Sequence, residues 1–152
     1  MLKISKKSSV ILSMVLSVGF TALMIGFFIF MKPFVWSYVD FRLPDALTSD
    51  RIYILIIGYL ISGVGIVAGA LLILLLRRVS NSLVFSPKSV AYVRAISWCA
   101  ILMGILFLLL WKYFTVALLI AFAGIFLGLC VRVVKNVIEE ATEIKAENDL
   151  TV

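Results

Sequence analysis

A chain of 152 residues that is 64% hydrophobic and only 14% charged has too little polar surface to cover a soluble core. Its mean hydropathy of +1.20 indicates a single integral membrane domain that spans residues 1–152. Basic residues that flank membrane helices beside anionic lipid headgroups explain the net charge of +6. The charge therefore requires no nucleic-acid partner, and we expect no direct nucleic-acid binding.

Four stretches without a charged residue divide the chain. A helix needs roughly 20 mostly apolar residues to cross a bilayer, and the third stretch reaches that length by borrowing residues 90–93. Lys112 alone separates the last two stretches, and one helix through both would measure about 55 Å against a hydrocarbon layer of ~30 Å. The chain must therefore turn back near Trp111, Lys112 and Tyr113. The sequence predicts helices over about 8–31, 51–78, 87–111 and 113–147.

The segment 32–51 between the first two predicted helices is rich in aromatic residues and contains two prolines. Pro33 and Pro44 argue against one regular element across it. We interpret its aromatic side chains as a belt at the lipid–water boundary. The alternative is a recognition surface for an extracellular ligand such as a membrane-active peptide. These side chains are Phe34, Trp36, Tyr38 and Phe41.

The segment 77–94 carries the signals of a helix start. Ser86 is a favourable N-cap, and Pro87 follows at the first helical position, where its missing N–H costs nothing. Phe85 and Val90 occupy the two positions of a hydrophobic staple. We expect the third helix to begin here, before it enters the lipid.

Small residues recur at four-residue spacing within the predicted spans, where they let helix backbones approach closely. Packing within one bundle is the simpler interpretation. The alternative is a homo-oligomer formed through Gly65 and Gly69 or through Gly124 and Gly128. The candidate packing residues are Gly65, Gly69, Ala100, Gly104, Gly124 and Gly128.

The four apolar stretches contain no acidic, basic or amide side chain, and the chain has no histidine. Ion and proton pathways usually need ionisable groups in the membrane, which argues against a secondary transporter. No base pairs with a nucleophile, so we expect no enzyme, no cofactor and no metal site. Cys99 and Cys130 are interpreted as small apolar residues kept reduced.

The distribution of basic residues orients the predicted bundle. Ten of the 14 lysines and arginines lie on the side that holds both termini, and four lie on the other. The positive-inside rule therefore predicts a multi-pass protein of the bacterial cell membrane with both termini in the cytoplasm.

The fourth helix has no stop signal at residue 131, which predicts that it continues into the cytoplasm. Val134, Ile138 and Ala141 belong to an apolar face of this extension, together with Val137 and Ile144. An acidic stripe lies beside it, although like charges four residues apart repel and acids oppose the helix dipole at this end. Either the extension packs on its own bundle, or it docks a basic partner. The candidate partner-binding residues are Glu139, Glu140, Glu143, Glu147 and Asp149.

Two local patterns resemble the bacterial membrane proteins of the family called domain of unknown function 2975. One is the run with Phe85, Ser86, Val90, Arg94 and Ile96, and the other is the ending 147–152, "ENDLTV". The resemblance extends over nearly the whole chain, with four spans and a basic N-terminal arm. Members are typically encoded beside a small helix-turn-helix regulator, which implies a membrane sensor or tether for a DNA-binding partner.

The resemblance and the acidic stripe suggest one function. A helix-turn-helix regulator carries a basic face for phosphate contacts, and an acidic cytoplasmic helix is suited to cover it. We therefore expect a non-enzymatic sensor or tether. The alternatives are an immunity or envelope-protection protein against membrane-active peptides, acting through the aromatic segment, and an accessory subunit of a transport complex.

Overall fold

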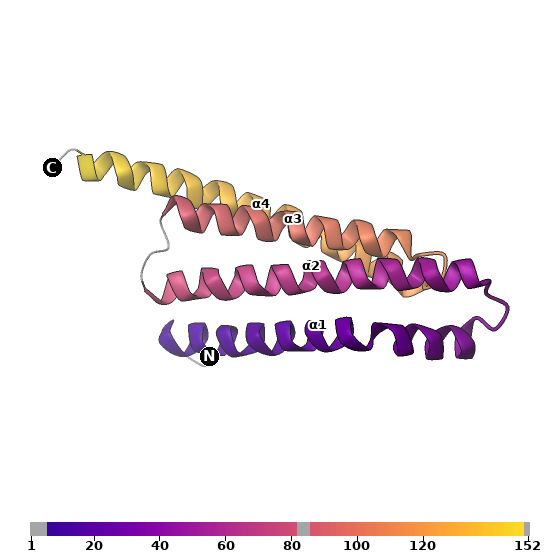
Figure 1. The fold of residues 1–152 in the computed structure, drawn as a ribbon. Coiled ribbons are helices and arrows are strands. Elements are labelled where there is room, and N and C mark those ends of the chain that lie inside the picture. The colour runs from indigo at the N-terminus through magenta and orange to yellow at the C-terminus, as the bar shows by residue number, and fades with distance from the viewer. Residues whose placement is uncertain (1–5, 82–85, 151–152) are drawn as a thin grey trace, which may run out of the picture.

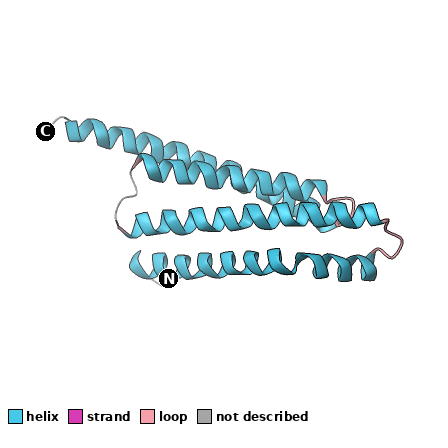
Figure 2. Cartoon of the chain, in the orientation of Figure 1, coloured by secondary structure: helices cyan, strands magenta, loops and turns pink. Residues whose placement is uncertain are grey.

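The computed structural model describes residues 6–81 and 86–150, and these form four helices (Figure 1). Their bounds are α1 (Lys6–Arg42), α2 (Thr48–Ser80), α3 (Pro87–Leu109) and α4 (Thr115–Leu150). All four are long and apolar enough to cross a membrane. In Figure 2 the described residues are helices and short loops, so the described part of the chain has the predicted all-α fold.

The helices pack in chain order, α1 on α2, α2 on α3 and α3 on α4. The backbones of α1 and α4 stay apart over the described residues. The start of α1, the end of α2, the start of α3 and the end of α4 lie at one end of the bundle, which we call the terminal end. The connections 43–47 and 110–114 lie at the opposite end, which we call the loop end (Figure 1).

The first helix is longer than predicted. Its expected end at residue 31 is corrected to Arg42, because the helix continues through Pro33. A proline inside a helix loses one hydrogen bond and costs roughly 3 kcal/mol. Met31, Val35 and Val39 compensate for that cost, because they follow one another at four-residue spacing and are all buried in the core at the loop end. Pro44 lies in the connection to α2, where the helical run does end.

The other three helices begin and end within a few residues of the predicted positions. α3 begins as expected, because Ser86 has extended backbone angles and its Oγ accepts a hydrogen bond of 3.4 Å from the Ser89 N–H. Pro87 is the first helical residue. The predicted staple falls partly outside the described residues, since Phe85 belongs to the segment 82–85.

Glycines on α2 face α1. A methyl group on Gly65 would lie 2.9 Å from the Met24 sulfur, and one on Gly69 would collide with the Thr21 hydroxyl. These two glycines are covered by α1 within a single chain. Association of two copies through them would therefore require α1 and α2 to separate.

Two helix backbones come close together where α3 crosses α4. A methyl group on Gly104 would lie 2.7 Å from the Ala121 carbonyl oxygen, and one on Gly124 would lie 3.3 Å from the Ala100 carbonyl oxygen. One helical turn further, the buried Ser97 hydroxyl donates a hydrogen bond of 2.8 Å to the Gly128 carbonyl. Small residues thus let the two backbones touch, and a hydroxyl links them inside the apolar layer.

Candidate functional site

The acidic extension is the part of α4 that follows its apolar stretch, residues 132–150. α4 contains 36 residues, which gives a length of about 54 Å, whereas a bilayer core of ~30 Å needs roughly 20 residues. The remainder continues as helix because it contains neither glycine nor proline. Figure 1 shows α4 projecting beyond the other helices at the terminal end.

Glu139, the first acid of the extension, forms ion pairs within its own chain. The Glu139 carboxylate accepts a hydrogen bond of 2.9 Å from the Arg94 guanidinium of α3, and it forms a second ion pair with Lys135 one turn earlier on α4. The Glu139 side chain is 35% exposed and that of Arg94 57%, so the Arg94–Glu139 pair contributes little to stability. The Arg94–Glu139 pair joins the start of the extension to α3, whereas the Lys135–Glu139 pair lies within α4.

The next acids along the extension point to solvent. Glu140, Glu143 and Glu147 are all exposed. Glu143 borders a small cleft of about 250 Å³ between α3 and α4, together with Arg94 and Glu139. Asp149 lies in the last turn of α4, and its side chain is outside the described part of the chain. The surface defined by Glu140, Glu143 and Glu147 is called the acidic stripe below.

The apolar face of the extension is only partly covered. Ile138 and Ala141 are half-buried. In contrast, Val134, Val137 and Ile144 are 52%, 61% and 54% exposed. The extension therefore presents apolar side chains and carboxylates on the same exposed length of helix, beyond the part of α4 that spans the apolar layer.

A second polar cluster, at the loop end, was not foreseen from the sequence. Tyr113 donates a hydrogen bond of 2.6 Å to Asp50, and Arg51 pairs with Asp40 at 2.6 Å. The hydrogen bond to Asp50, together with burial, raises the pKa of Tyr113 to about 12. The cluster connects residues 63 positions apart, so no local pattern could have indicated it.

The aromatic side chains near Pro33 do not form one surface. The Tyr38 ring stacks on Phe114 with 4.7 Å between centroids, and Trp36 is half-buried against the core. Phe34 and Phe41 are 54% and 81% exposed. Only part of the proposed recognition surface is therefore open, and the rest packs within the bundle.

Comparison with known families identifies the chain. A family model described as "Protein of unknown function (DUF2975)" matches residues 31–152, which is most of the chain. The chain belongs to the DUF2975 family. The resemblance seen in the sequence is thereby confirmed, and the matched region includes α2, α3 and the whole of α4 with its acidic extension. No curated protein and no solved structure matches the chain.

The two cysteines of this DUF2975 protein lie on different helices. Cys99 of α3 is half-buried, whereas Cys130 of α4 is exposed, and both are free thiols. Across residues 6–81 and 86–150, no three histidine, cysteine, aspartate or glutamate side chains are grouped as a metal site would require.

Proposed function

We propose that this DUF2975 protein is a non-enzymatic membrane sensor or tether that binds a small cytoplasmic helix-turn-helix regulator through the acidic extension of α4. The observation that carries the proposal is the exposure of Glu140, Glu143 and Glu147 on a helix that projects past the rest of the bundle. The association of such regulators with the family, implied by the resemblance, supplies the class of partner.

The electrostatics of the extension favour a partner over a purely structural role. Glu139, Glu143 and Glu147 follow one another at intervals of four, and each like-charged pair costs a few tenths of a kcal/mol. Carboxylates near the C-terminal end of a helix also oppose its dipole. Glu139 recovers part of this cost through Arg94 and Lys135. A basic surface placed on the other acids would remove the remaining repulsion.

The exposed apolar residues add a second component of recognition. Val137 and Ile144 lie seven positions apart, on the same side of the helix, and both are more than half exposed. An amphipathic helix of this kind binds by placing its apolar residues in a groove while its charges steer the encounter. The DNA-binding face of a helix-turn-helix protein is basic, so a regulator held here would be kept from DNA.

The test is co-purification with the regulator encoded beside the gene, in mild detergent and at low salt. The variant carries Glu140→Gln, Glu143→Gln and Glu147→Gln, which removes three charges and keeps the helix. We expect its affinity to fall at least about tenfold, because surface charge pairs contribute up to about 1 kcal/mol each. Binding equal to that of the parent protein would reject the electrostatic interface.

Two controls separate this interface from a general effect of charge. Asp40→Asn with Asp45→Asn removes acids at the loop end, and we expect the affinity to be unchanged. Val137→Ser with Ile144→Ser keeps every charge but removes the exposed apolar groups, and we expect the complex to dissociate faster. A loss of binding in the loop-end variant would place the contact elsewhere.

A further inference from the structure

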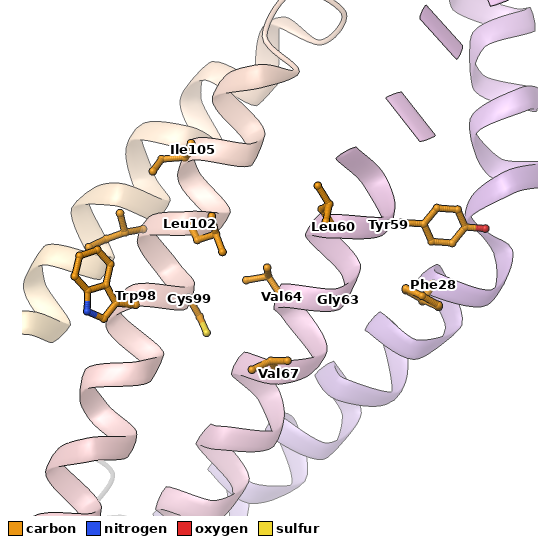
Figure 3. Close-up of a pocket in the computed structure, with 11 residues that line it drawn as sticks. Phe28, Tyr59, Leu60, Gly63, Val64, Val67, Trp98, Cys99, Leu102 and Ile105 are labelled. Atoms are coloured by element: carbon orange, nitrogen blue, oxygen red, sulfur yellow. The ribbon is translucent and has the colours of Figure 1, made fainter. Parts of the chain in front are cut away.

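An apolar groove runs between α2 and α3. Figure 3 shows Val64 and Val67 of α2 on one side of it, with Cys99 and Leu102 of α3 on the other. Its volume is about 740 Å³. Gly63 contributes to the opening, because nothing lies within 4 Å of the position that its side chain would occupy. The groove lies in the apolar stretches of both helices, so its occupant must be apolar as well.

Cationic groups border the groove toward the terminal end. Trp98, which lines the groove, has the Arg132 guanidinium above its ring at 4.9 Å from the centroid. Arg94 lies one turn before Trp98 on α3, and its side chain is 57% exposed. A tryptophan beside an arginine is typical of the depth at which lipid headgroups begin.

The local charge at this rim is positive. Arg94, Arg132 and Lys135 supply three cations, and Glu139 is the carboxylate that pairs with two of them. Glu143 borders the neighbouring cleft and is exposed, so solvent screens its charge. An anion that approaches Arg132 and the open side of Arg94 therefore meets net attraction.

We propose that the groove and these two arginines form a binding site for an anionic phospholipid. An acyl chain would fill the groove between α2 and α3, and the phosphate would lie between Arg94 and Arg132. Guanidinium groups match phosphate oxygens with paired hydrogen bonds, and an acyl chain matches a lining that is almost wholly apolar. The site does not include the acidic stripe, because it is built from α2, α3 and Arg132, the first residue of the extension.

Trp98 reports directly on this site. In a Trp36→Phe, Trp111→Phe protein, Trp98 is the remaining tryptophan. The protein is reconstituted in phosphatidylcholine bilayers to which a lipid with brominated acyl chains is added. The brominated lipid is phosphatidylglycerol in one sample and phosphatidylcholine in the other, and its bromine atoms quench indole fluorescence on contact. The ratio of quenching by the two brominated lipids gives the preference for the anionic lipid. We expect a preference of at least about fivefold, since a basic residue near the headgroups contributes about 1 kcal/mol.

The arginines should account for this preference. We expect Arg94→Gln with Arg132→Gln to bring the ratio close to one, whereas Lys112→Gln, a cation at the loop end, leaves it unchanged. The ratio compares two lipids in the same variant, so it is insensitive to the loss of the arginine above the Trp98 ring. Equal quenching in the parent protein, or a preference that survives the loss of both arginines, would overturn the proposal.

The groove is tested by filling it. Gly63→Leu places a side chain in the open space between α2 and α3, while Gly19→Leu places the same side chain in open space on α1, away from the groove. We expect Gly63→Leu to lower total quenching and the anionic preference, with Gly19→Leu like the parent. If both variants bind phosphatidylglycerol equally well, the groove is not the acyl-chain site.

Discussion

The Tyr113 hydroxyl donates a hydrogen bond of 2.6 Å to Asp50, which joins the connection before α4 to the first turn of α2. Asp50 also accepts a hydrogen bond of 3.2 Å from the Leu47 N–H, so the same carboxylate caps α2. Tyr53 donates to the Leu109 carbonyl beside it, at 3.2 Å. These hydrogen bonds therefore connect the α1–α2 hairpin to the α3–α4 hairpin at the loop end.

This contact predicts an unusual titration. The neutral phenol donates to a carboxylate, so the pKa of Tyr113 is raised from 10.0 to about 12. A raised pKa in the folded state means that its stabilising effect is complete below pH 10 and is lost as the pH rises through about 12. Tyrosinate absorbance in detergent should show a late-titrating contribution from Tyr113, and Tyr113→Phe should remove that contribution.

Substitution of the carboxylate distinguishes the cause. We expect Asp50→Asn to return the late component toward pH 10, because the charge that disfavours the tyrosinate is gone. Tyr92→Phe, on α3 away from the loop end, should leave the late component in place. A late component that persists in Tyr113→Phe would assign it to another tyrosine and contradict the hydrogen bond.

The α3–α4 crossing predicts a stability effect of a single methyl group. Gly104→Ala would place its Cβ 2.7 Å from the Ala121 carbonyl oxygen, so the two backbones must move apart. Overpacking of this kind costs about 1–3 kcal/mol, which exceeds the ~1 kcal/mol that alanine gains over glycine in a helix. Gly26→Ala meets nothing within 4 Å and should be neutral or stabilising. Unfolding in mixed detergent micelles measures the stability of both variants. Equal stability of Gly104→Ala and Gly26→Ala would contradict the close contact between α3 and α4.

Local signals in the sequence were sufficient for most of the fold. Charge-free stretches located the four helices, and Ser86 with Pro87 marked the start of α3 because capping is a matter of neighbouring residues. Pro33 misled the prediction of the end of α1. Its local cost is outweighed by the burial of Val35 and Val39 against other helices, and such packing is invisible in a single segment.

The sequence located one of the candidate sites, whereas the others depend on tertiary packing. The acidic stripe follows from helical periodicity, so the sequence located it. The pairing of Tyr113 with Asp50 and the groove beside Gly63 depend on how α2 and α3 are placed in space. Periodicity within one helix contains no information on that placement.

The terminal end offers a matched pair of arginines for a further prediction. Arg78 donates hydrogen bonds to the Ser89 and Ser86 hydroxyls at 3.2 and 3.0 Å, which ties the end of α2 to the start of α3. Arg77, its neighbour, is exposed. We expect Arg78→Gln to lower the free energy of unfolding by about 1–2 kcal/mol and Arg77→Gln to leave it nearly unchanged.

Hydrogen exchange localises that effect. Loss of Arg78 should speed exchange in the first turns of α3, where Ser89 is buried. Amides of the α3–α4 crossing near Gly104 should exchange as before, because they lie several turns away. If Arg78→Gln and Arg77→Gln lowered the free energy of unfolding equally, the hydrogen bonds of Arg78 would contribute nothing beyond the effect of its charge.

Binding of a cytoplasmic regulator depends on the orientation of the bundle in the membrane. Ten of the 14 basic residues belong to the side with both termini, which predicts that this side faces the cytoplasm. Asp45 at the loop end and Asn148 on the acidic extension are both exposed. In a Cys99→Ser, Cys130→Ser background, Asp45→Cys should react with a membrane-impermeant maleimide in intact spheroplasts, and Asn148→Cys only after permeabilisation. The reverse pattern would place the acidic stripe outside the cell, where a DNA-binding regulator cannot reach it, while the lipid site would stay intact in the opposite leaflet.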